Sequence, residues 1–522
     1  MNGRGNLLLA VVALMLAVAQ MTARGAAVQV DASARALEIR GAGADERFGR
    51  PIVCADINGD GYEDIFVGAD RSIFSGGQRP TLFVFRGSPT FATRDLIELT
   101  TDTADAVILG DTGSNNFANA LAAGDVNGDG IADLIAVDSS LTVSGRTGAG
   151  AVFVLFGRTN FFSQPTYDLA LGDWSVKLLG ASAFDDTGGY NLFGGLVSRG
   201  VAAGDLNNDG MDDIAVGAHL ATANSRSQSG KVSVVYGRNP FAAGTTIDLA
   251  SQASSTILGN ETGAEMGTDL AIGDINADGI KDLIIGEEYG SRTTFSTDGR
   301  IFVIYGAGSF PSSVNLLTQA AGLTITGAHS WDSLGSAVAV ADANGDGKGD
   351  LIATVSGWDH ANSTSIDEGA VYGFFGKSTF PASLDLLSAT PDFLVEGYNS
   401  SNAIGRTLVS GDFNGDGVGD FLFASRDGGR GGFSGEGRTY LVLGRTGLPS
   451  SFSVQSENMD YIFNGSVAGF QLGDWLGAGD LDGDGADEIL IAAPFVFSTT
   501  GRLLVFDLNP VVAASPTWAL YE

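Results

Sequence analysis

Residues 125–133 read DVNGDGIAD, a segment with an acid or amide at positions 1, 3, 5 and 9 and glycine at position 6. The pattern D-x-[N/D]-x-D-G-x-x-[D/E] occurs seven times, beginning at Asp56, Asp125, Asp205, Asp274, Asp342, Asp412 and Asp480. These starting positions are 69, 80, 69, 68, 70 and 68 residues apart. Copies at so regular an interval indicate seven equivalent structural units.

Short apolar runs surround each copy of the pattern. In the second unit, residues 121–124 precede it, residues 134–137 follow it, and a third run covers 151–156. A fourth run ends a unit, such as residues 107–110 or 256–259. Runs of this length next to glycine favour β-strands over helices. Seven units of four antiparallel strands predict an all-β fold, a seven-bladed β-propeller.

The two ends of the repeat region complement each other. The seventh unit has a third strand at 502–506 but no clear fourth, whereas residues 36–41 resemble a fourth strand and precede the first loop. We expect this N-terminal strand to complete the seventh blade and close the ring, which leaves no free sheet edge there. The predicted propeller therefore covers residues 36–508, and residues 509–522 form a tail outside the pattern.

The N-terminus reads as an export signal. Arg4 precedes an unbroken apolar run over residues 7–19, and small residues offer cleavage after Ala19 or Ala27. The run is shorter than the ~20 apolar residues of a spanning helix. A cleaved signal peptide over residues 1–27 is therefore favoured over an uncleaved membrane anchor. We expect a monomeric protein that is secreted, periplasmic or on the cell surface, with no membrane insertion after cleavage.

Composition narrows the range of partners. The formal net charge is -33, which argues against nucleic acid and anionic membrane surfaces. Cys54 is the only cysteine, so an intrachain disulfide is impossible and another means of stabilisation is expected.

The repeated segment has the chemistry of a calcium loop. Positions 1, 3, 5 and 9 offer side-chain oxygens, position 7 offers its carbonyl, and glycine permits the turn; such oxygen-only ligands suit Ca²⁺ better than Zn²⁺ or Cu²⁺. We expect about one Ca²⁺ per blade, up to seven. The predicted side-chain ligands are Asp56, Asn58, Asp60 and Asp64; Asp125, Asn127, Asp129 and Asp133; Asp205, Asn207, Asp209 and Asp213; Asp274, Asn276, Asp278 and Asp282; Asp342, Asn344, Asp346 and Asp350; Asp412, Asn414, Asp416 and Asp420; and Asp480, Asp482, Asp484 and Glu488.

Hairpin turns without metal are the alternative, because Asp-Gly and Asn-Gly are common turn dipeptides. Seven copies with the same acid spacing favour the metal, since carboxylates held within one turn repel one another unless a cation joins them. An EF-hand is excluded, because its loop extends to a Glu at position 12 and lies between helices.

The chain resembles the FG-GAP repeat family, which includes the N-terminal propeller of integrin α chains. The Phe-Gly element occurs as Phe48-Gly49 and Phe193-Gly194, and the Gly-Ala-Pro element as Ala492-Ala493-Pro494. The calcium loop lies between these two elements, as in the family. The resemblance implies a calcium-bearing propeller that binds its ligand on the face opposite the calcium loops.

Two functions remain open on the sequence alone. The first is an extracellular binding or adhesion module for a protein or glycan; the alternative is a polysaccharide-acting, lyase-like enzyme or a lectin. No catalytic residue is predicted, because the chain has neither a paired-histidine motif, a G-x-S-x-G elbow nor a P-loop. The loops opposite the calcium loops carry the candidate ligand-face residues His329, Trp331, Trp358, His360, Tyr190 and Tyr398.

Overall fold

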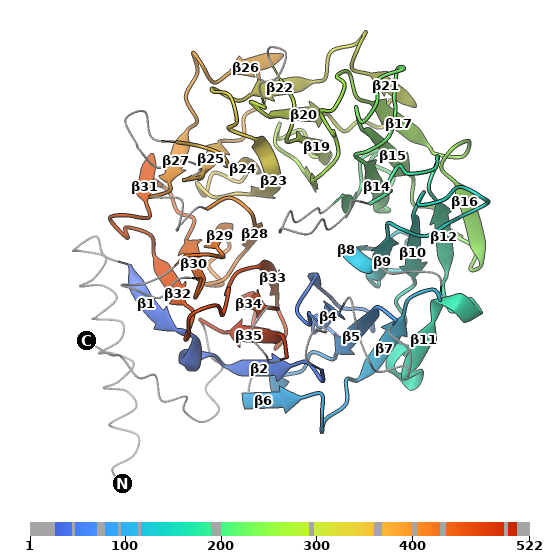
Figure 1. Cartoon of the computed structure of the whole chain (residues 1–522), viewed down its shortest axis with the longest axis vertical. Helices are drawn as coiled ribbons and strands as arrows, with labels where there is room; N and C mark the ends of the chain where they lie inside the picture. Colours follow the sequence, from blue (N-terminus) through green and yellow to red (C-terminus); the bar gives the residue numbers. More distant parts are fainter. Residues whose placement is uncertain are drawn as a thin grey trace.

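Seven β-sheets are arranged radially around a central axis in the computed structural model (Figure 1). The structure describes residues 27–43, 47–69, 79–91, 95–112, 116–188, 200–291, 297–359, 368–398, 404–428, 435–494 and 500–508. The seven-bladed β-propeller is thereby confirmed. Within the described ranges, no helix is long and apolar enough to cross a bilayer.

Each sheet has five strands and is written here from the axis outward. Blades one to four are β3(Ile52–Ala55)-β4(Asp64–Ala69)-β5(Thr81–Phe85)-β7(Ala106–Leu109)-β11(Thr166–Asp168), β8(Phe117–Gly124)-β9(Asp133–Asp138)-β10(Ala151–Leu155)-β12(Val176–Leu179)-β16(Thr245–Asp248), β13(Val201–Gly204)-β14(Asp213–Ala218)-β15(Lys231–Val235)-β17(Ser255–Leu258)-β21(Ser313–Asn315) and β18(Leu270–Gly273)-β19(Asp282–Glu287)-β20(Arg300–Ile304)-β22(Leu323–Thr326)-β26(Ser383–Asp385). Blades five to seven are β23(Leu334–Ala341)-β24(Asp350–Val355)-β25(Ala370–Phe374)-β27(Phe393–Glu396)-β31(Ser451–Ser453), β28(Leu408–Gly411)-β29(Asp420–Ser425)-β30(Arg438–Val442)-β32(Tyr461–Asn464)-β1(Val28–Asp31) and β33(Trp475–Gly479)-β34(Glu488–Ala493)-β35(Arg502–Phe506)-β2(Leu37–Arg40)-β6(Asp95–Glu98). Short 3-10 helices are η1(Ala32–Ala34), η3(Phe161–Ser163) and η4(Leu169–Leu171).

The prediction of four antiparallel strands per blade was incomplete, because a fifth strand runs parallel to the fourth. In six of the seven blades this strand comes from the following repeat along the ring. Blade one is an example, because its fifth strand β11 lies in the second repeat and pairs with β7 at Tyr167↔Ile108. An ion pair holds several of these outer strands in place. Arg79 of blade one contacts Asp168 at the end of β11 at 2.7 Å, and Arg146 contacts Asp248 at the end of β16 at 2.9 Å. Neighbouring blades are therefore joined by shared sheets as well as by side-chain packing.

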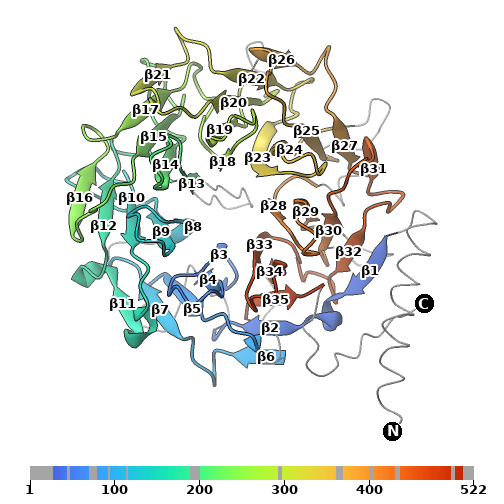
Figure 2. The same ribbon diagram turned by 180° about the vertical axis from the view of Figure 1, so that it is seen from behind.

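The N-terminal strands complete the last two blades (Figure 2). Strand β2 pairs antiparallel with β35 and parallel with β6, as expected for the strand that closes the ring. Strand β1, which was not predicted, pairs parallel with β32 and takes the outermost position of blade six. Residues near the two ends of the described chain therefore share two sheets.

The apolar core lies between adjacent blades. One cluster combines Phe66 and Val84 of blade one with Phe117 and Phe153 of blade two, whose rings meet edge-to-face at 6.4 Å between centroids. The second strand of every blade is buried along its whole length, which explains the apolar run that follows its first, acidic residue. The residue at position 9 of each loop is the first residue of that buried strand, so its carboxylate is held rigidly.

Candidate metal centres

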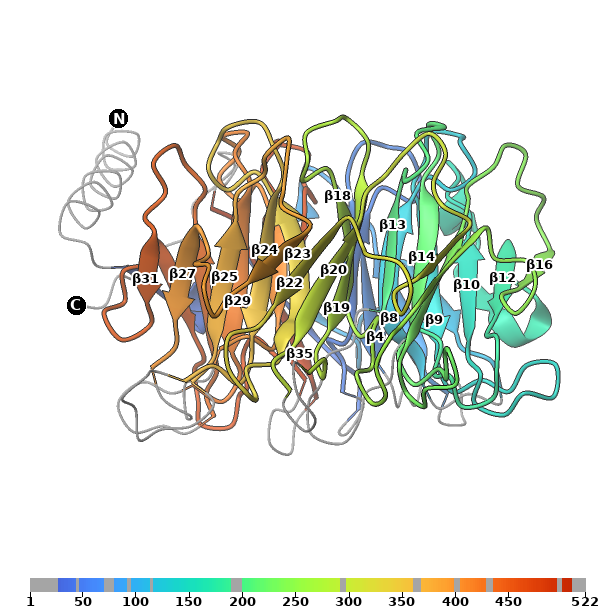
Figure 3. The ribbon, with the colours of Figure 1, turned by 90° about the horizontal axis from the view of Figure 1, so that it is seen from above.

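The seven Asp-rich loops all join the first strand of a blade to the second. The strands of a blade run between the two faces of the disc (Figure 3). Because the inner strands of each blade are antiparallel and all seven loops make the same connection, all seven lie on one face. We call them loops one to seven, in chain order, and this face the loop face. The connections from second to third strand, and from one blade to the next, lie on the opposite face.

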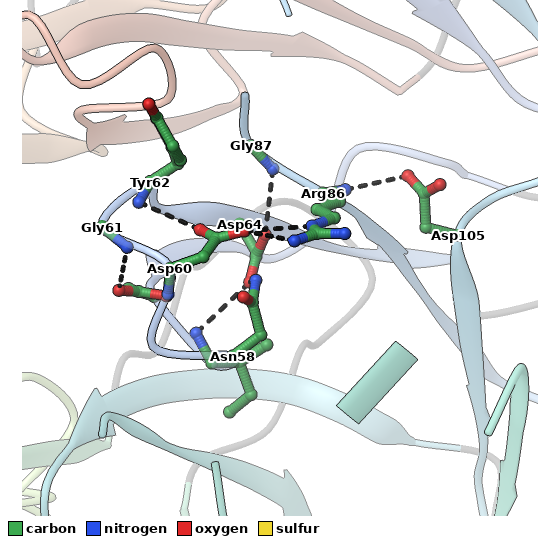
Figure 4. Close-up of polar contacts among 10 residues, drawn as sticks. Asn58, Asp60, Gly61, Tyr62, Asp64, Arg86, Gly87 and Asp105 are labelled. Atoms are coloured by element: carbon green, nitrogen blue, oxygen red, sulfur yellow. Dashed lines mark hydrogen bonds and ion pairs between the residues drawn. The ribbon is translucent and has the colours of Figure 1, made fainter. Parts of the chain in front are cut away.

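The acid at position 1 organises the turn of each loop. In loop one, the two carboxylate oxygens of Asp56 accept hydrogen bonds from the backbone N–H groups of Asp60 and Gly61, at 3.0 and 2.8 Å. The Asp60 carboxylate accepts one from Tyr62 N–H at 3.2 Å (Figure 4). The backbone therefore folds around the acidic side chains and keeps several of their oxygens on one side of the turn.

The acid at position 9 is buried beneath the turn. Asp64 accepts hydrogen bonds from Ile57 N–H, from the Asn58 amide at 3.0 Å and from Gly87 N–H at 2.9 Å (Figure 4). Burial, which penalises the charged form, raises the pKa of Asp64 to about 7 and of Asp133 in loop two to about 8. Each loop thus holds a carboxylate whose charge the surrounding protein does not fully stabilise.

A glycine just after the third strand explains a second regularity of the sequence. Its N–H donates to the position 9 carboxylate in six blades. A Cβ on Gly157 would lie 2.3 Å from the Ala132 carbonyl oxygen, so only glycine allows this approach. The six glycines are Gly87, Gly157, Gly237, Gly306, Gly376 and Gly444, with N···O distances of 2.7 to 3.0 Å.

The donor set of the loops fits Ca²⁺. All candidate ligands are oxygens, and the Asn58 amide and the Asp64 carboxylate lie close enough for both to face one ion. In loop three, the side-chain oxygen of Asn207, at position 3, is buried and accepts no hydrogen bond. A buried carbonyl oxygen without a donor is costly, and a hard cation would satisfy it.

Loops one, five and seven differ in charge. In loop one the Arg86 guanidinium contacts the Asp60 carboxylate, with Nη2 2.5 Å from Oδ2, and in loop five Lys348 contacts Asp346 at 2.6 Å. Loop seven instead has acids at positions 1, 3, 5 and 9, and Asp507 lies beside it. Burial, with added repulsion from Asp482 and Asp507, raises the pKa of Glu488 to about 9. Sequence reasoning missed Asp507, and an acid directly after the third strand was its only signal.

Comparison with known proteins identifies the repeat. The family described as FG-GAP repeat matches residues 199–235, 334–374 and 472–506, and the FG-GAP-like repeat matches residues 56–136. These matches coincide with blades of the propeller and include five of its loops, namely one, two, three, five and seven. The chain is an FG-GAP, integrin-alpha-like β-propeller.

The relatives of this FG-GAP propeller are longer proteins. Phosphatidylinositol-glycan-specific phospholipase D of Bos taurus is 25% identical over 419 residues, covering 76% of this chain and 46% of the relative. The Rattus norvegicus protein of the same name is 32% identical over 152 residues, 29% of this chain and 17% of the relative. Integrin alpha-IIb of Homo sapiens is 31% identical over 238 residues, 45% of this chain and 20% of the relative. The matched region thus spans less than half of each relative.

The candidate ligand-face residues of the propeller have different environments. Trp331 is 64% exposed and Tyr398 44% exposed, and the exposed His329 imidazole lies 3.6 Å from the Asp332 carboxylate. Trp358 is only 9% exposed and packs in the core between blades four and five, so its assignment to an exposed binding surface was wrong. Its segment does adjoin that of Trp331, since Gly357 N–H donates to the Asp332 carbonyl at 3.1 Å. Tyr190 and His360 lie outside the described residues.

A cavity of about 320 Å³ lies where blades three and four meet. Its lining includes Asn260, Glu261, Arg300, Phe302 and Gln319. Glu261 is the single carboxylate of that lining, and it forms an ion pair with Arg300 at 2.6 Å. This cavity therefore does not contain the paired carboxylates that a glycoside-cleaving site requires.

Proposed function

We propose that this FG-GAP propeller is an exported, calcium-stabilised module that binds an extracellular protein or glycan. The observation that carries the proposal is the sevenfold repetition of one oxygen-only donor set on a single face. The orphaned Asn207 oxygen and the raised pKa values of the buried position 9 carboxylates support it.

The residues at positions 1, 3, 5 and 9 of each loop would hold the cation, together with the position 7 carbonyl. Bound Ca²⁺ would supply charge neutralisation and no bond-breaking chemistry. The chain itself positions the ligands: the position 1 acid shapes the turn, and the glycine after the third strand orients the position 9 carboxylate. The cations would then stabilise the connection between the two innermost strands of each blade.

The relatives suggest what kind of partner the module takes. Integrin alpha-IIb is by name an integrin subunit, and the phospholipase D relatives are by name specific for phosphatidylinositol-glycan. A binding role for the propeller region fits both groups of proteins without requiring catalysis by it. On this chain, the exposed aromatic rings of Trp331 and Tyr398, opposite the loop face, are suited to contact protein or sugar surfaces.

Calcium binding is tested by calorimetric titration of CaCl₂ into chelator-treated protein, with melting curves recorded in parallel. We expect up to seven bound ions and a clear rise of the melting temperature in millimolar calcium, since ions that bind only the folded state stabilise it by mass action. An unchanged melting curve and no binding heat would show that the loops are metal-free turns.

Ligand binding is tested on glycan and protein arrays probed with and without calcium. For any ligand found, Trp331→Ala should weaken binding by about tenfold, as for an aromatic anchor. The matched control is Leu171→Ala, which truncates an exposed side chain beside the outermost strand β11. Trp358 is left unchanged in this test, because truncation of its buried side chain would open a cavity in the core. Equal binding by wild type and Trp331→Ala would place the site elsewhere.

A further inference from the structure

The acids around loop seven are more numerous than at any other loop. Asp480, Asp482 and Asp484 present carboxylate oxygens within 4.8 Å of one another, and Asp482, Glu488 and Asp507 form a second such group. Asp482 belongs to both groups. In the second group the three residues are only 8%, 2% and 6% exposed.

Asp507 occupies a place that is never acidic in the other blades. It directly follows β35, the third strand of blade seven. The corresponding residues, each following the third strand of its blade, are Arg86, Phe156, Tyr236, Tyr305, Phe375 and Leu443. Loop seven also has Asp482 at position 3, where the other six loops have Asn. Two independent substitutions thus add negative charge at the same point.

The distances are those of ligands that share one ion. Oxygens bound to a calcium ion at 2.3 to 2.6 Å lie at most about 5 Å apart. The oxygens of Asp507, Asp482 and Glu488 meet this limit, and Asp482 and Glu488 are already candidate ligands by their loop positions.

We propose that Asp507 is an additional carboxylate ligand of loop seven and makes it the tightest calcium site of the ring. The inference rests on the proposed calcium binding of the loops. Affinity of oxygen-ligand sites rises with the number of charged ligands. Loop seven assembles five carboxylates, whereas the other six loops carry three acids each at their ligand positions.

The test is a calorimetric titration of chelator-treated protein with CaCl₂, comparing wild type with Asp507→Asn. Wild type should show one step at least about tenfold tighter than the others, and the variant should lose that step and keep the rest. The matched control is Asp129→Asn, which removes a carboxylate from loop two and should weaken a weak step alone. Asp482→Asn gives loop seven the Asn of the other loops and should also abolish the tight step.

Melting curves provide a readout that a merely structural role of Asp507 would not produce. Without calcium, Asp507→Asn should melt at the wild-type temperature or above it, because the amide removes the repulsion with the carboxylates of Asp482 and Glu488. With calcium, the melting temperature of the variant should rise by less than that of the wild type. Equal steps in wild type, or a tight step that survives both Asp507→Asn and Asp482→Asn, would overturn the inference while leaving calcium binding intact. Absence of every step would instead refute the calcium proposal itself.

Discussion

Loops one and seven share a sequence pattern and a backbone turn but neutralise their charge differently. In loop one, Arg86 reaches back to Asp60, so part of the negative charge is balanced by the protein. In loop seven, Asp507 adds a further acid to a set that already includes Asp482 and Glu488. The position after the third strand thus holds a base that balances charge at loop one and an acid that adds charge at loop seven. We therefore expect the residue that follows the third strand to influence the strength of each proposed calcium site together with the repeated pattern.

The largest contrast is expected at position 9 in calcium-free protein. Asp64→Asn should destabilise the fold by about 2 to 3 kcal/mol, because an amide cannot accept all the hydrogen bonds that the carboxylate accepts. Glu488→Gln should leave the free energy of unfolding unchanged or raise it. Its side-chain oxygen can still accept from Leu481 N–H, while its amide group donates to the neighbouring acids. Urea denaturation in chelator measures both. Equal losses at the two positions would remove the distinction between the loops.

A smaller effect is expected in the pH dependence of the calcium-free protein. The folded-state pKa values of Asp64 and Glu488, about 7 and about 9, lie above the ordinary carboxyl values. A raised pKa favours folding at low pH, and that contribution is lost as pH rises through the folded-state value. The melting temperature in chelator should therefore fall by a few degrees between about pH 6 and 9. Asp507→Asn should reduce the upper part of this fall, and a melting temperature that rises over this range would contradict the electrostatic description.

The smallest effect concerns Arg86, whose side chain is half exposed. Arg86→Gln should free the Asp60 carboxylate and tighten calcium binding at loop one by about threefold to tenfold, since a competing positive charge is removed. Arg158→Gln is a matched control, because Arg158 directly follows Gly157, the glycine after the third strand of blade two. Its side chain contacts Gln164 and Tyr167 instead of a loop acid. Calcium titration of the two variants checks the expectation. An identical response would mean that Arg86 moves aside without cost.

The sequence predicted the ring, the loops and the closing strand because each has a strong local signature repeated seven times. It missed the fifth strand, because segments such as Asp95–Glu98 are short, half exposed and paired with a neighbouring repeat that periodicity along the chain does not reveal. It also misplaced Trp358, since an aromatic residue in a loop has the same sequence signature whether it packs inward or outward. Asp507 was missed because its meaning depends on a loop nineteen residues earlier in the chain, which only folding brings near it.

The closing strands have a consequence for how the protein folds. Gln29 bonds to Glu457 across 428 residues, and Leu37 pairs with Val505. A chain made or exported from its N-terminus presents these strands first, yet their partners emerge last. Contacts so distant in sequence slow folding, and strand edges left unpaired meanwhile invite association with other chains. Closure of the ring is therefore the folding step at which association with other chains competes most with correct pairing. A cation bound beside the end of β35 would act at the sheet where that closure takes place.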